Sequence, residues 1–233
     1  MKRAMALGMA FGLLGLVAPL WAAPKDVANK KALQELGDFV GGWKGSASVK
    51  LAPGPRDKSW EETVQWGWKF KGDDCWMILD FKGGKFLKNA ELRYNSDKKK
   101  YLLTGMLPDG KTKAEFTGKF DDDKLTFERD VPETKGKQRL RINTAAEGIR
   151  LIYIVEGKTG TLWKPEFALA ATKEGESLTK KEKGPECVVS GGRGTTAVSF
   201  GGETFYICCS GCADAFKENP KKYVDEFKKK KKK

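Results

Sequence analysis

Between residues 39 and 172, large apolar residues alternate with polar ones in short runs. The clearest run is Val64–Phe70, in which every second residue is large and apolar. A period of two places such side chains on one face of a β-strand. Turn residues such as Pro108–Gly110 separate the runs. The pattern therefore predicts about ten short strands.

The connections between these strands are short, and no helical pattern interrupts them. The simplest product is an antiparallel up-and-down barrel closed on itself, because closure removes exposed strand edges. We therefore expect a mainly β fold, with the barrel over residues 39–172. Five tryptophans of this region are expected to fill its interior, unless it encloses a small apolar ligand: Trp60, Trp66, Trp68, Trp76 and Trp163.

Two segments precede the barrel. Residues 1–22 begin with Lys2 and Arg3, continue as an apolar run and end in small residues, which is typical of a secretory signal peptide. An uncleaved membrane anchor or a buried core helix is the alternative. Residues 23–38 predict a short helix that Gly37 ends. We expect an exported protein, periplasmic or extracellular, that is not an integral membrane protein after cleavage.

A short motif stands where the helix meets the barrel. It is Phe39–Gly45, in which Gly41 and Trp43 form a Gly-x-Trp pair at the start of the first strand. With the charged hairpins that follow, it resembles the lipocalin-like (calycin) barrels, and more narrowly an exported barrel family of unknown function. The resemblance implies an up-and-down barrel, and calycin relatives often hold an apolar ligand inside.

The charge of the chain is concentrated at its ends. The formal net charge is +13, of which Lys2 and Arg3 supply two and the tail Lys228–Lys233 supplies six. The remaining +5 is no sign of a nucleic-acid surface. The tail, residues 228–233, is expected to be solvated and disordered, and it could touch an anionic surface weakly. No aromatic residues interleave it, so no specific nucleic-acid partner is expected.

The composition changes again after the barrel. Residues 173–184 are charged, contain Gly175 and Gly184 and are followed by Pro185, which predicts a linker. In the unit 185–227 that follows, Gly201-Gly202 predicts a hairpin that pairs residues 197–200 with 204–207. Asn219-Pro220 predicts the start of a helix. A unit this small, with few large apolar residues, needs a disulfide or a bound metal for stability.

Four of the five cysteines lie in the last 47 residues, and the chain has no histidine. The missing histidine excludes a Ser-His-Asp triad, a Cys-His pair and any His-containing zinc site. Cys187 stands at the start of the unit, and Cys208 and Cys212 stand where a strand is expected to give way to a helix. Helix N-termini favour thiolates, which are metal ligands. The fifth cysteine, Cys75, is expected to be a buried small hydrophobe in the barrel.

The cysteine spacing and its surroundings form a motif. Twenty residues separate Cys187 from Cys208 and three separate Cys208 from Cys212. With Phe205–Cys208, Phe216 and Asn219-Pro220 before Tyr223, this unit resembles the YHS domain and the TRASH-like heavy-metal-binding domain. The resemblance implies that Cys187, Cys208 and Cys212 are metal ligands. Cys209 is additional and could be a fourth ligand, a redox partner or a bystander.

Three soft thiolates suit one thiophilic ion, copper or zinc. Cu(I) accepts three ligands and Zn(II) usually takes four, so both metals remain open. We expect a non-enzymatic exported protein, with no catalytic residues, that captures, buffers or delivers this ion and could hand it to a partner protein.

Three alternatives remain. The exported location favours a disulfide from Cys187 to Cys208 or Cys212. Cys209 and Cys212 form a Cys-x-x-Cys that could belong to a thiol-disulfide enzyme. The barrel could carry an apolar small ligand, with the C-terminal unit as a stapled appendage.

Overall fold

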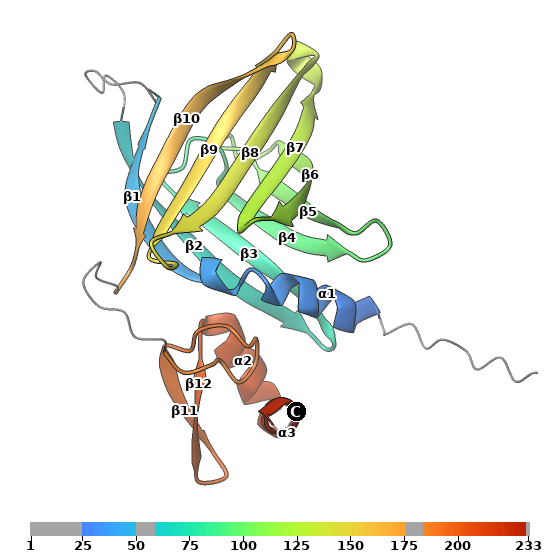
Figure 1. Ribbon diagram of the computed structural model, residues 1–233, viewed down its shortest axis with the longest axis vertical. Helices are drawn as coiled ribbons and strands as arrows, with labels where there is room; N and C mark the ends of the chain where they lie inside the picture. The colour runs from blue at the N-terminus through green and yellow to red at the C-terminus, as the bar shows by residue number, and fades with distance from the viewer. Residues whose placement is uncertain (1–24, 50–58, 176–183, 232–233) are drawn as a thin grey trace, which may run out of the picture.

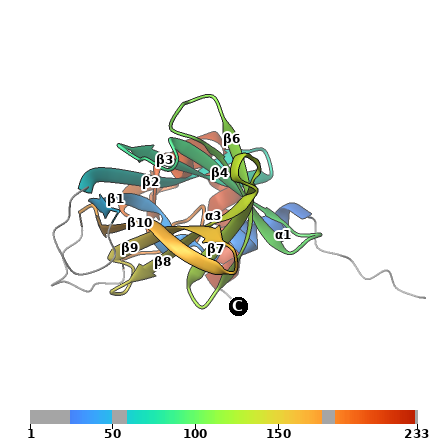
Figure 2. The same cartoon turned by 90° about the horizontal axis from the view of Figure 1, so that it is seen from above.

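The computed structural model describes residues 25–49, 59–175 and 184–231. The expected signal peptide over residues 1–22 and most of the expected linker lie outside these ranges. Ten antiparallel strands form a closed barrel, in which each strand pairs with the next along the chain and the last pairs with the first (Figures 1 and 2). The strands are β1 (Gly41–Ser48), β2 (Ser59–Lys71), β3 (Asp74–Lys82), β4 (Asn89–Asn95), β5 (Lys100–Met106), β6 (Lys113–Asp121), β7 (Lys124–Val131), β8 (Gly136–Ala145), β9 (Arg150–Thr159) and β10 (Leu162–Lys173). This confirms the predicted mainly β fold and the antiparallel barrel.

The alternation of β2 is the clearest link from sequence to interior. Val64, Trp66 and Trp68 are each 1 % exposed and face inward, as their spacing predicted. Trp76 and Trp163 do not fill the interior. Trp76 alternates with buried residues of β3 and lies under the guanidinium of Arg93, 4.2 Å from its ring centre. Trp163 of β10 is likewise only half-buried and lies under the guanidinium of Arg139 of β8, 4.2 Å from its ring centre. Cationic side chains cover these two rings on the outer face of the barrel, so the prediction for them was wrong.

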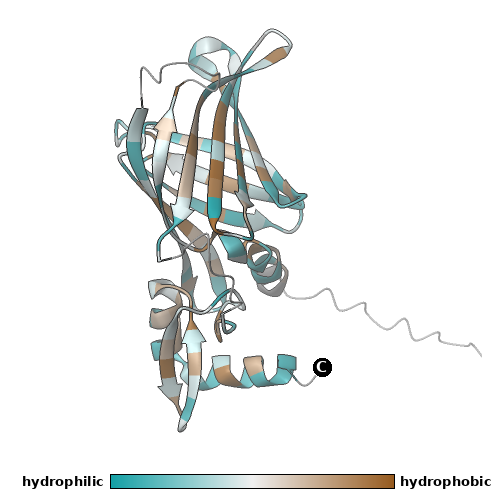
Figure 3. Ribbon diagram, turned by 60° about the vertical axis from the view of Figure 1, so that its left-hand side comes forward, coloured by the Kyte–Doolittle hydropathy of each residue, from teal (hydrophilic) through white to brown (hydrophobic). Residues whose placement is uncertain are grey.

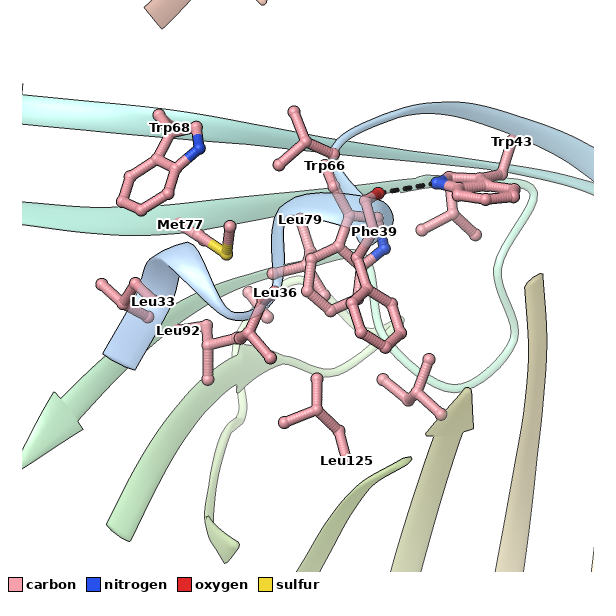
Figure 4. Packing of buried hydrophobic residues seen from close by; sticks show 14 of the residues in the cluster. Leu33, Leu36, Phe39, Trp43, Trp66, Trp68, Met77, Leu79, Leu92 and Leu125 are labelled. Carbon is pink, nitrogen blue, oxygen red and sulfur yellow. Dashed lines mark hydrogen bonds between the residues drawn. The ribbon is translucent and has the colours of Figure 1, made fainter. Parts of the chain in front are cut away.

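A short helix closes one end of the barrel. The helix α1 (Lys25–Gln34) is followed by the 3-10 turn η1 (Gly37–Phe39), so the α-helix ends earlier than the predicted range 23–38. The tighter turn directs Phe39 into the barrel, where its carbonyl accepts a hydrogen bond from Trp43 Nε1 at 2.8 Å (Figure 4). Leu33 and Leu36 have no exposed area and pack beside it. Burial of each such side chain contributes about 1.5–3 kcal/mol to folding.

The C-terminal unit lies beneath this closed end and combines a hairpin with two helices (Figure 1). The hairpin pairs β11 (Thr196–Phe200) with β12 (Glu203–Ile207), which confirms the strand pairing expected around Gly201-Gly202. The helix α2 (Ser210–Glu218) follows directly, and α3 (Pro220–Lys231) completes the unit.

The helix α3 differs from expectation at its C-terminal end. Its start is as predicted, because Asn219 Oδ1 accepts the Lys222 N–H at 3.2 Å as an N-cap. The helix continues past residue 227 to Lys231, so Lys228–Lys231 form its last turn and are not disordered (Figure 3). Lysine is a good helix former and is favoured at a helix C-terminus. Lys228 pairs with Glu203 and Lys230 with Glu186, which also ties this turn to the rest of the unit. No helix within the described ranges is both long and apolar enough to cross a lipid bilayer.

Candidate metal site

Cys187 is placed by a tight loop that is bonded to the end of the hairpin. Its own N–H donates to the carbonyl of Gly192 at 2.6 Å, and its carbonyl accepts the N–H of Gly191 at 2.9 Å. The next residue, Val188, donates its N–H to the Tyr206 carbonyl at 2.8 Å. These bonds hold the loop 187–192 against β12, so that Cys187 stands beside the residues that follow this strand.

Cys208 and Cys212 are placed by the change from strand to helix. The strand β12 ends at Ile207 and α2 begins at Ser210, with Cys209 at its N-cap position. Cys212 therefore lies in the first turn of α2, where unpaired backbone N–H groups and the helix dipole favour a thiolate.

The three predicted ligands come together. The Sγ atoms of Cys187, Cys208 and Cys212 all lie within 4.8 Å of one another, and those of Cys208 and Cys212 are 3.5 Å apart. Cys187 and Cys212 have no exposed area, and Cys208 is 8 % exposed. All five cysteines are in the described part of the chain, and none of them forms a disulfide there. The structure thus unites thiols separated by 20 residues in the sequence.

The spacing of these sulfur atoms fits one soft ion. Zinc–thiolate bonds are about 2.3 Å long, so two sulfurs on the same ion stand about 4 Å apart. The three Sγ atoms are at this spacing within a small adjustment. The chain has no histidine, so sulfur is the main donor here. A buried group of three thiols suits a thiophilic ion rather than Mg²⁺ or Ca²⁺. Three close cysteines could therefore hold a metal ion.

The thiols also influence one another's protonation. Hydrogen bonds from Cys208 and Cys212 lower the pKa of Cys187, and hydrogen bonds from the same two residues lower the pKa of Cys209. The hydrogen bond to Cys187, further thiol contacts and burial raise the pKa of Cys212. The pKa of Cys208 is raised as well, chiefly by its hydrogen bond to Cys187. A bound cation would favour the thiolate form of every ligand.

Ser190 belongs to the site, and the sequence did not point to it. Its side chain is 1 % exposed, and its Oγ lies 3.3 Å from Cys208 Sγ. The N–H of Gly192 donates to the same Oγ at 3.4 Å. The sequence offers no spacing that marks this serine, so only the folded loop reveals that its hydroxyl lies beside the Cys208 thiol.

Cys209 lies next to the group of three but is not part of it. Its Sγ is 4.0 Å from that of Cys208, and it accepts the backbone N–H of Trp68 at 3.4 Å. This N–H is available because β1 begins opposite Trp66, so the end of β2 has no strand neighbour on that side. The backbone of Gly211 packs directly against the Trp68 carbonyl, where a Cβ would collide. The start of α2 thus covers a free strand edge.

The helix α1 contacts the site from the other side. Gln34 Nε2 donates to the Ser190 carbonyl at 2.7 Å, and Lys30 pairs with Glu226 of α3 at 3.4 Å. A pocket of about 610 Å³ lies beside this contact, between the barrel end and the cysteine loop, and its lining includes Asp38, Glu186 and Arg193. The thiol group is therefore enclosed between the C-terminal unit and the closed end of the barrel.

The fifth cysteine does not belong to the group of three. Cys75 is 4 % exposed on the inward face of β3, which agrees with its prediction as a small buried hydrophobe.

Comparison with known proteins gives no family. No protein-family model matches the chain, including any for the YHS or TRASH-like domains, and no curated protein matches its sequence. Among solved structures, the chain is similar to the crystal structure of Rv2717c from M. tuberculosis, with 17 % identity and a TM-score of 0.34. The match covers 61 % of this chain and 97 % of that one. A likeness at this level carries no argument about function.

Proposed function

We propose that the protein binds one thiophilic metal ion, copper or zinc, through Cys187, Cys208 and Cys212. The observation that carries the proposal is the convergence of these three Sγ atoms within 4.8 Å of one another. The protein would act without catalysis, by capturing, buffering or delivering the ion. The signal-like residues 1–22 favour a periplasmic or extracellular location for this role.

The surroundings of the thiols support a metal site over an accidental cluster. A small unit cannot bury enough apolar surface to be stable alone, and an ion held by three chain-distant thiolates would join its loop, strand and helix. Exclusion of water from Cys187 and Cys212 also protects the thiolates from competing ligands. The three-thiolate set satisfies Cu(I), whereas Zn(II) would need a fourth donor.

The thiol-disulfide alternative has less support. It requires Cys209 and Cys212 to act as a pair, but Cys209 Sγ is engaged with the Trp68 N–H. Cys212 Sγ also lies 3.5 Å from Cys208 Sγ and within 4.8 Å of Cys187 Sγ, so it is shared with the group of three. A disulfide staple would use the same buried thiols, so it competes with the metal and excludes it.

The experiment is metal analysis with thiol counting on anaerobically purified mature protein. The wild type is expected to hold one equivalent of copper or zinc and to lose it in the Cys208→Ser/Cys212→Ser variant. Cys75→Ala is the matched control, because it removes a buried thiol that does not belong to the group of three, and this variant should keep the ion. Absence of metal together with four oxidised cysteines would contradict the proposal and favour the staple.

A second candidate function concerns the barrel interior. The indole N–H groups of Trp66 and Trp68 are buried and have no hydrogen-bond partner among the described residues. An unsatisfied buried donor costs about 1–3 kcal/mol, which a small ligand with an acceptor group would relieve. Mass spectrometry of organic extracts of the purified protein tests this: a bound small molecule supports the carrier function, and its loss in Trp66→Phe would locate it.

A further inference from the structure

One sulfur atom beside the three buried thiols belongs to a more exposed residue, Cys209. Cys209 is half-buried, whereas Cys187 and Cys212 have no exposed area. Its Sγ stands 4.0 Å from Cys208 Sγ, close to the separation of two sulfurs on one ion. Cys209 is therefore a soft donor adjacent to the site and within partial reach of solvent.

The resting position of Cys209 is defined by the barrel. Its Sγ accepts the Trp68 N–H at 3.4 Å and also lies 4.0 Å from Cys208 Sγ, so it stands between the end of β2 and the three thiols. This hydrogen bond is a weak one that a rotation of the side chain can break. Cys209 thus has two available partners, the strand edge and an ion held by its neighbour Cys208.

An ion enclosed by the three buried thiols has a slow route out. Release in one step would break three metal–sulfur bonds, and an incoming ligand cannot reach Cys187 or Cys212 from solvent. Exchange through a fourth, more exposed sulfur replaces one bond at a time. The cost of each step is then lower than that of complete dissociation.

We propose that Cys209 is the exchange thiol of the site, through which the ion enters and leaves. In this step a bond forms between Cys209 Sγ and the ion, while the bond from Cys208 Sγ breaks. Both electron pairs remain on sulfur, and the oxidation state of the ion does not change. Cys209 gives its proton to water, and the released Cys208 thiolate takes one up. The acceptor is a thiol or chelating group that collects the ion from Cys209. This inference rests on the proposed metal-binding function.

The test is the rate of Cu(I) transfer to a chromophoric Cu(I) chelator, measured by stopped-flow absorbance under anaerobic conditions on full-length mature protein. The variant is Cys209→Ser, which keeps the size of the side chain and an acceptor for the Trp68 N–H but removes the soft donor. Cys75→Ala is the control. Equilibrium copper content is measured in parallel.

The expected result is one equivalent of copper in all three proteins, with transfer from Cys209→Ser slowed at least about tenfold, or about 1.4 kcal/mol in the barrier. Unchanged transfer rates would overturn the exchange role. Loss of the copper equivalent in Cys209→Ser would overturn it too, because Cys209 would then be a resident ligand. A wild type without any copper or zinc would instead refute the metal-binding function itself, so the two failures are distinguishable.

Discussion

The barrel and the C-terminal unit differ in what fills their interiors. Within the described ranges, the largest side chains with less than 2 % exposure, such as Trp43, Trp66 and Phe127, lie in the barrel or in the segment that closes it. The interior of the C-terminal unit contains fewer large apolar groups, such as Phe205, Phe216 and Tyr223, together with three buried thiols. A closed sheet around a large apolar core can be stable without a cross-link, whereas a unit as small as the C-terminal one is expected to need a cross-link or its contact with the barrel.

Removal of the proposed metal ion is expected to destabilise the C-terminal unit and leave the barrel unchanged, and this is the largest of the expected effects. A structural thiolate site can contribute about 10–16 kcal/mol to folding in small metal-binding peptides. Chelation of the ion should therefore abolish amide-exchange protection in β11, β12 and α2, while the barrel strands keep theirs. Hydrogen-exchange mass spectrometry with and without chelator measures this. Equal protection of the C-terminal unit in both states would show that the ion is not needed for its fold.

The contact between the regions is tested by Gly211→Ala. The added Cβ would collide with the Trp68 carbonyl, and such overpacking costs about 1–3 kcal/mol. The start of α2 should move away from β2, so that the Trp68 amide exchanges faster and the unfolding midpoint falls. Ser210→Ala, at the exposed neighbouring position, is the control. Identical exchange at Trp68 in both variants would mean that the two regions do not depend on this contact.

Local sequence patterns predicted many features of the two regions, but they did not predict the contacts between them. The alternation Val64–Phe70 identified the inward face of β2, and the Gly201-Gly202 turn identified the hairpin. Both signals are local. The contact of Cys209 with Trp68 joins residues 141 positions apart and follows from where β1 begins, which no local pattern encodes. The outward position of Trp76 was missed because an aromatic ring can be covered by an arginine as well as by a core.

In the candidate site, too, some residues were expected from the sequence and others depend on tertiary contacts. The grouping of Cys187, Cys208 and Cys212 was expected from the resemblance of their motif to metal-binding domains, and the three Sγ atoms do lie together. The part played by Ser190 depends on the fold of the loop 187–192, and its anchoring by Gln34 depends on the docking of α1. Side chains that act through tertiary contacts leave no spacing to recognise.

The smallest expected effect is a pH dependence of the stability of the barrel that comes from Glu62. Glu62 is 1 % exposed and accepts hydrogen bonds from Tyr153 and Trp60. Burial raises its pKa above the ordinary glutamate value despite these bonds. The folded state therefore holds this proton more tightly than the unfolded state does, and stability falls as the pH rises from the ordinary value through the raised one.

Glu62→Gln should flatten this pH dependence, because the amide does not titrate. Each unit of pKa difference is worth about 1.4 kcal/mol. Chemical denaturation at a series of pH values from 4 upward, about the ordinary glutamate range, measures the slope. A wild type whose stability rises over this range at the same rate as the variant's would contradict the assignment to Glu62.

The metal-binding proposal requires that Cys187, Cys208 and Cys212 bind one ion together, and X-ray absorption spectroscopy at the metal edge of the anaerobically purified protein measures this. We expect a shell of three sulfur atoms at about 2.3 Å that loses one sulfur in Cys187→Ser. A shell with fewer than three sulfurs in the wild type, or one that Cys187→Ser leaves unchanged, would contradict it.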